Sequence, residues 1–334
     1  MNSPSTPARR ALAAFLLALT AGVVLTACGG ARNAASTGSR GAVVSMIVTG
    51  NADEAATNEL AVAQYLLVSR CMSAHGFHTL APATPPPSPE QRVSPLLSNG
   101  GDIVTVPSEA AAIREAQEWG YGITARRDQG HQVGSQSGTS TFRSTPPAKK
   151  ASQATGYTVA LTGHGVNRIF TVPGIAQHTY PTEGCSAKGL GQLYGSPLLA
   201  VQATYLPEDL NLAVTHQVLV QPEFHEAAAR WSACLAKGTG LRARSPYEVT
   251  DSLLTGIESH SGPATPAERA FESRVAVADT RCQYSTGLVR TAAALRRHFA
   301  ESLSGPYEGL LVTLLEVRAR ASRNAESVLS QAGR

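Results

Sequence analysis

Apolar residues recur every three or four positions over long stretches of this chain, which is the pattern of amphipathic α-helices. The first stretch begins at Asn51, a residue type that caps helix N-termini, and ends before Gly76, which can close a helix in the left-handed conformation. Its apolar stripe consists of Ala56, Leu60, Ala63, Leu67, Cys71 and Ala74. The spacing therefore predicts a helix that turns the sulfur of Cys71 toward the core.

Proline-containing start patterns predict three helices in the last third of the chain. Pro222 can occupy the first turn of one, and Ser245-Pro246 and Thr265-Pro266 each open a capping box with glutamate at the third helical position. The stripes expected to be buried are Phe224, Ala228, Trp231 and Leu235, and then Phe271, Val275, Ala278, Cys282 and Val289. After a break at Gly305-Pro306, a last helix is expected to fold back as an αα-hairpin. Its stripe contains Leu310, Leu314, Val317, Ala321 and Val328.

The middle of the chain carries shorter patterns. Ser108 is expected to cap a short helix that stops at Gly120, and residues 184–195 are expected to form another. Residues 157–163 and 167–174, "YTVALTG" and "NRIFTVPG", are predicted to be short strands.

Two segments have no apolar period at all. Residues 81–97 are interrupted by prolines, and residues 126–155 are polar, so we expect a long disordered loop there. The complete pattern predicts a mainly α fold, a helical bundle-like domain with few short strands.

An apolar run over residues 11–25 follows Arg9 and Arg10. It is shorter than the about 20 residues of a membrane span, and its basic start and small flanking residues indicate a secretory signal. Residues 25–28, Leu-Thr-Ala-Cys, resemble the bacterial lipobox. The resemblance implies cleavage before Cys28 and a diacylglyceryl group on its thiol. The two acyl chains of this group suffice for stable membrane anchoring. An ordinary signal peptide is the alternative, and the arginine pair leaves the twin-arginine route open.

These features predict three parts: a lipoprotein signal peptide over 1–27, a lipidated tether over 28–50 and a helical extracytoplasmic domain over 51–334. Small polar residues over 29–42 are typical of a flexible linker. The predicted location is the outer face of the bacterial cell membrane, with the membrane itself as one partner.

The composition bears on both the kind of partner and the fold class. Loss of residues 1–27 removes two arginines and no acid, so the formal charge falls from +4 to +2, which does not favour nucleic acid. Aromatic residues make up only 5% of the chain, which favours packed helices over a β-sandwich.

Four cysteines besides Cys28 indicate disulfides in an exported protein. The stretches "SRCMSAHG" and "SACLAKG" echo each other, and each precedes a second cysteine. The echo favours the pairs Cys71–Cys185 and Cys234–Cys282, in two similar halves (51–200 and 201–334). A crossed pairing, from Cys71 to Cys234 or Cys282, stays open.

Several motifs together resemble a group of uncharacterised secreted actinobacterial lipoproteins. They are the lipobox, "CM" followed by "GF", "GC" followed by "LYG", "RWSACLAKG" and "VAVADTRCQYSTGLV". The resemblance implies an extracytoplasmic, disulfide-linked α fold and no activity.

Histidines and acids form no complete catalytic or metal-binding motif. His75 and His78 make an H-x-x-H pair, but a glycine between them ends the helix and the pair lacks a third ligand. His225-Glu226 begins a zinc-protease pattern, yet Ala229 stands where the second histidine belongs. We therefore expect no metal site here.

Two further residues are expected to have structural rather than catalytic roles. Asp279 is expected to be a surface charge, and Trp231 is expected in the core over a disulfide. Nucleotide-binding, haem-binding and nucleophile-elbow motifs are missing from the sequence, so no cofactor is expected.

Three functions fit these observations to different degrees. The first is a non-catalytic binding or scaffolding module that meets a cell-wall component or another exported protein. The alternative is an envelope hydrolase assembled from distant residues, with His164, Glu183 and His225 as candidates by residue type. A solute-binding protein for a transporter fits less well, because parallel strands are scarce.

Overall fold

The computed structural model describes residues 30–50, 54–77, 108–128, 151–258 and 262–332, and these are predominantly helical, as predicted. The chain divides into two compact units, residues 1–38 and 39–334. The signal peptide and Cys28 lie outside the described residues. None of the described helices has both the length and the hydropathy that a membrane crossing requires.

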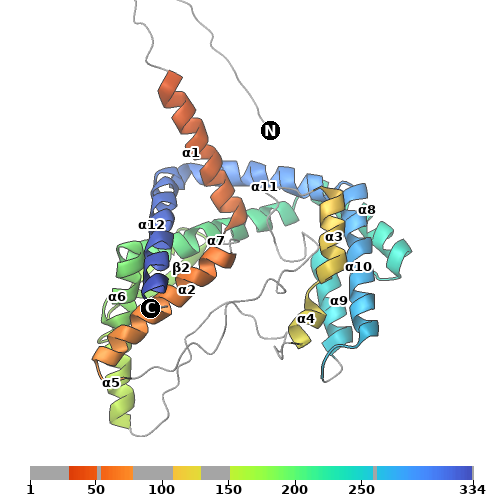
Figure 1. Cartoon of the computed structure of the whole chain (residues 1–334). Helices are drawn as coiled ribbons and strands as arrows, with labels where there is room; N and C mark the ends of the chain where they lie inside the picture. The colour runs from red at the N-terminus through yellow and green to blue at the C-terminus, as the bar shows by residue number, and fades with distance from the viewer. Residues whose placement is uncertain (1–29, 51–53, 78–107, 129–150, 259–261, 333–334) are drawn as a thin grey trace, which may run out of the picture. The chain divides into compact units, whose positions relative to one another are not determined.

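Figure 1 labels the elements in chain order. They are α1 (Gly30–Thr49), α2 (Glu54–Ala74), α3 (Glu109–Trp119), α4 (Ile123–Asp128), α5 (Ala151–Thr162), β1 (Asn167–Val172), β2 (Ala176–Pro181), α6 (Gly184–Tyr194), α7 (Pro197–Leu219), α8 (Pro222–Thr239), α9 (Pro246–Glu258), α10 (Pro266–Ser285), α11 (Leu288–Ser304), the 3₁₀ turn Gly305–Tyr307 and α12 (Glu308–Ala332).

The segment expected to be a flexible tether is helical from Gly30, and its second part belongs to the core. Val43 and Ile47 are fully buried, because the run "AVVSMIV" supplies an apolar helix face. The small polar residues before this run are typical of a linker, so the sequence did not predict a helix here. Carbonyl oxygens at the end of α1 accept hydrogen bonds from two buried or half-buried arginines, Arg296 to Val48 and Arg318 to Gly50. Cationic donors suit a helix C-terminus, where carbonyls lack partners within the helix.

One group of helices gathers around α12, which packs on α2, α6 and α7. α6 also packs on α2 and α5, and the disulfide Cys71–Cys185 joins α2 to α6. The close approach of α2 and α6 depends on Gly189, since a Cβ there would lie 3.2 Å from a methyl carbon of Val68. A small apolar cluster of Val68, Met72, Tyr157 and Cys185 surrounds this bridge.

A second group consists of α3, α4, α8, α9 and α10, which lie side by side (Figure 1). α10 contacts each of the others, and the disulfide Cys234–Cys282 joins it to α8. Both favoured cysteine pairings are thus confirmed. Trp231 and Leu235 are fully buried, and Phe224 and Ala228 are buried, as predicted. In the stripe predicted for α10, Phe271 is instead 40% exposed, because it lies in the first turns of the helix.

The strand predictions are half correct. Residues 167–172 form β1, which pairs antiparallel with β2 in a hairpin that lies on α7. Residues 157–163 are instead the second half of α5 and the glycine after it. Of the segment expected to be disordered, residues 126–128 end α4 and 151–155 begin α5; the rest lies outside the described residues, as does 81–97.

The predicted αα-hairpin at the C-terminus is wrong. The long helix expected before Gly305 is broken at Gly287, whose φ of 77° is left-handed and costs glycine little. α11 packs on α7 and α8, whereas α12 packs on α2, α6 and α7. Local sequence shows where α12 begins, but its partner is set by apolar faces far away in the chain.

The predicted caps form at Ser108 and Thr265, whereas the Glu248 carboxylate of the box predicted at Ser245 accepts the backbone N–H of Arg244 instead. The Ser108 hydroxyl accepts the backbone N–H of Ala111, and Thr265 and Glu268 form a complete capping box with Pro266 in the first turn. The division into two similar halves stays a prediction; α12 packs on α2 and α6 across its boundary, and α3 packs on α10.

Candidate functional site

A histidine and an aspartate meet where β2 lies on α7. The Nε2 atom of His178 is 2.7 Å from an Oδ2 atom of Asp209, which is buried. The His178 ring stacks on Tyr205, with ring centroids 4.0 Å apart and planes 12° apart. A carboxylate that orients an imidazole is one half of the arrangement used in acyl-transfer catalysis.

The other half of such an arrangement is a nucleophile. Within the described residues, Asp209 is the one polar group that hydrogen-bonds to the His178 ring. The ring is also largely covered, since the side chain is 20% exposed. The pair therefore holds the hairpin on α7, and no hydroxyl or thiol of the described chain completes a nucleophile–base pair with it.

Three exposed apolar residues lie on or beside this hairpin. Val166 precedes β1, Ile169 lies on the exposed face of β1 and Ile175 lies in the turn between the strands. They are 50%, 63% and 36% exposed, and they are three of the seven large apolar residues that are exposed in the described chain. Ile169 lies opposite Thr179 in the antiparallel register. Exposed apolar residues gathered on one element mark an interaction surface more often than scattered ones do.

The three residues predicted for a hydrolase do not come together. The backbone N–H of His164 donates to the Glu183 carboxylate at 3.3 Å, but no hydrogen bond of the described residues joins His225, on α8, to either. The contact between His164 and Glu183 reflects backbone packing: Gly163 and Gly184 both have φ of +76°, and a Cβ on Gly163 would lie 2.4 Å from the Cβ of Glu183. His78 of the H-x-x-H pair lies outside the described residues.

A buried carboxylate on α10 binds the turn that links α3 to α4. Glu272 is 1% exposed and accepts four hydrogen bonds from that turn. They come from the backbone N–H groups of Tyr121 (2.8 Å), Ile123 (2.8 Å) and Thr124 (3.0 Å) and from the Thr124 hydroxyl (2.5 Å). An anion is favoured at the first turn of a helix, where N–H groups lack partners, and Glu272 supplies it to α4.

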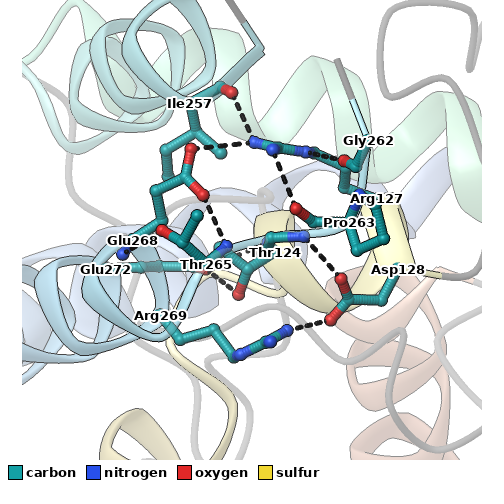
Figure 2. Close-up of polar contacts among 11 residues, drawn as sticks. Thr124, Arg127, Asp128, Ile257, Gly262, Pro263, Thr265, Glu268, Arg269 and Glu272 are labelled. Carbon is teal, nitrogen blue, oxygen red and sulfur yellow. Dashed lines mark hydrogen bonds and ion pairs between the residues drawn. The ribbon is translucent and has the colours of Figure 1, made fainter. Parts of the chain in front are cut away.

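Arg127, on α4, attaches this helix to the end of α9, to the segment that follows it and to the start of α10 (Figure 2). Its guanidinium donates to the carbonyl oxygens of Ile257, Gly262 and Pro263 and to the Glu268 carboxylate at 3.0 Å. Hydrogen bonds from the Thr265 backbone and hydroxyl, and then from Arg127, lower the pKa of Glu268 to about 2. Asp128 binds Arg269 and the backbone N–H of Ala264. The charged groups of Arg127 and Asp128 thus hold α4 against α9 and α10.

Asp279 was expected to be a surface charge, but it is fully buried. It lies two helical turns after Glu272, on the same face of α10. Its Oδ2 accepts the Tyr121 hydroxyl at 2.7 Å, and its Oδ1 accepts the Trp231 indole N–H at 2.7 Å and the Gln283 amide at 3.0 Å. Burial raises the pKa of Asp279 to about 6, against the lowering effect of these three hydrogen bonds.

Sequence reasoning missed both buried carboxylates, although a signal was present. Glu272 and Asp279 are seven residues apart and lie in phase with Val275 and Cys282, on the face that α10 buries. An acid in phase with an apolar stripe predicts a buried, hydrogen-bonded carboxylate. The His178–Asp209 pair had no such signal, since it joins a strand to a helix.

The comparisons with known proteins add no relative: no family model, no curated protein and no solved structure matches the chain. The resemblance to secreted actinobacterial lipoproteins thus stays a prediction from the motifs.

Proposed function

We propose that this chain is an extracytoplasmic bacterial lipoprotein, held on the outer face of the cell membrane by a diacylglyceryl group on Cys28. Its helical body is a non-catalytic module that binds or scaffolds another envelope component. The observation that carries the proposal is the presence of two internal disulfides, which persist outside the cytoplasm and are rare within it. The lipobox-like residues 25–28 supply the anchor.

The outer face of the β1–β2 hairpin is the surface that we propose for the partner. Its exposed residues include Ile169, Thr171, Gln177 and Thr179, so the face carries apolar and uncharged polar groups. Such a face suits another exported protein better than a charged cell-wall polymer, because apolar contact drives most protein association. A cell-wall component is the other possible partner.

Capture from a solubilised envelope fraction tests this surface. The full-length tagged chain and its Phe271→Asp variant, which changes an exposed apolar residue on α10, are expected to retain the same exported protein. Ile169→Asp is expected to reduce the retained amount several-fold, since it replaces the exposed apolar side chain of this uncharged face by a charge. Equal retention by all three chains, or none above an unrelated control protein, would contradict the proposal.

A hydrolase is the second candidate, and the His178–Asp209 pair is the observation that favours it. Hydrolysis of cell-wall fragments by the purified chain, abolished in His178→Ala, would support this candidate. Unchanged hydrolysis in that variant would point away from the pair.

A further inference from the structure

A histidine lies beside one of the two disulfides. The Sγ atoms of Cys71 and Cys185 and a ring nitrogen of His75 all lie within 4.8 Å of one another. Within the described residues this is the one set of three potential metal ligands at such distances. Two thiolates and an imidazole are a ligand set typical of zinc.

The position of His75 is fixed by the way α2 ends. The backbone N–H of Phe77 donates to the Met72 carbonyl and that of Gly76 to the Ser73 carbonyl, both at 2.9 Å, and Gly76 has φ of +82°. These bonds form a Schellman motif, in which His75 is the C-cap residue. Phe77 then packs edge-on against Tyr157 with ring centroids 5.5 Å apart. The backbone of His75 is thereby fixed one helical turn after Cys71, and its exposed side chain lies beside the two sulfur atoms.

Cys185 approaches the same point from α6. It is fully buried in the first turn of that helix, where backbone N–H groups lack partners within the helix. The packing of Gly189 against Val68 also keeps α2 and α6 close, independently of the covalent bond. Opening the disulfide would therefore leave the two sulfur atoms near each other and near His75.

We propose that Cys71, His75 and Cys185 form a zinc site when the Cys71–Cys185 disulfide is reduced. A dithiol reductant supplies two electrons and two protons: the S–S bond of the protein breaks, an S–S bond forms in the reductant, and each cysteine becomes a thiol. Zinc then binds both sulfurs and the His75 nitrogen, and the two thiol protons are released. A fourth position stays open to water, as in sites with three protein ligands.

The required movement is small. Tetrahedral zinc with Zn–S bonds of about 2.3 Å places its two sulfurs about 3.8 Å apart, and a nitrogen about as far from each. The Cα atoms of Cys71 and Cys185 are 5.6 Å apart. Rotation of the two cysteine side chains can open the sulfurs to this separation while α2 and α6 stay in place. Oxidation and zinc thus compete for the same two sulfurs.

Cobalt(II) is the probe for the site, because sulfur ligation gives a charge-transfer band and tetrahedral geometry gives intense d–d bands. The full-length chain carrying Cys28→Ser is reduced with dithiothreitol, which is then removed without oxygen. The parent is compared with His75→Ala, which removes one ligand, and with Cys71→Ser/Cys185→Ser. The last variant keeps Cys234 and Cys282 as a cysteine pair without the His75 site.

The reduced parent is expected to bind one cobalt with both signals, and zinc should displace it. His75→Ala should bind at least about tenfold more weakly, and the double variant and the oxidised parent should show neither signal. If reduction unfolds the chain, zinc is expected to restore the helical circular dichroism of the parent but not of His75→Ala. Equal binding by the parent and His75→Ala, or no signal and no recovery in the parent, would overturn the proposal.

Discussion

Glu272→Ala is expected to lower the free energy of unfolding by about 4 kcal/mol, because it leaves four buried donors without an acceptor. Three of them are backbone N–H groups, one in the α3–α4 turn and two in the first turn of α4, and the fourth is the Thr124 hydroxyl. None can turn to solvent while α4 stays docked on α10. Urea unfolding followed by circular dichroism measures the loss.

Two control variants separate the carboxylate from the side-chain volume. Glu226→Ala changes an exposed glutamate on α8 and is expected to alter stability by less than about 0.5 kcal/mol. Glu272→Gln keeps the shape but replaces one acceptor oxygen by a donor, so its loss should fall between the two. If Glu272→Ala unfolds at the same urea concentration as Glu226→Ala, the carboxylate does not hold the α3–α4 turn.

Asp279→Asn is expected to remove a pH dependence of stability of about 3 kcal/mol. The pKa of Asp279 is about 6 in the folded chain and about 4 when unfolded. Between these values the folded state binds more protons than the unfolded state, so the contribution of Asp279 is most favourable below pH 4. It decreases as pH rises to about 6 and is constant above that.

The asparagine preserves the hydrogen bonds while removing the charge. Its oxygen can accept from Trp231 and Gln283, and its amide can donate to the Tyr121 hydroxyl oxygen. The stability of Asp279→Asn relative to the natural chain should therefore increase between pH 4 and pH 7. Asp279→Ala, which leaves all three donors without an acceptor, should be less stable than both at pH 7.

Urea unfolding at both pH values measures this difference, with Asp251→Asn as a control for an exposed aspartate on α9. The control should follow the pH dependence of the natural chain. If Asp279→Asn also follows it, the pKa of Asp279 does not differ between the folded and the unfolded chain, and its burial does not couple protonation to folding.

Features set by neighbouring residues were predictable from the sequence. Ser108 and Thr265 cap their helices as expected, since the bonds involved span three residues. The cysteine pairs also followed from the echo of two short motifs. α1 was missed because its apolar run follows small polar residues that are typical of a linker.

Apart from the cysteine pairs, features set by distant residues were not predictable. Glu272 and the residues that it binds are about 150 positions apart in the chain, so no local pattern connects them. The partner of α12 and the pairing of His178 with Asp209 depend likewise on which apolar faces meet. At the candidate zinc site, the sequence thus identified the pair Cys71–Cys185 and the residue His75, but not that His75 lies beside the pair.

Metabolic labelling with radioactive palmitate tests directly whether this chain is a lipid-anchored envelope protein. The natural chain is expected to incorporate the label and to sediment with membranes, whereas Cys28→Ala should be unlabelled and released into the soluble fraction. An unlabelled natural chain, together with a Cys28→Ala variant that stays equally membrane-bound, would contradict the anchor and the location proposed from it.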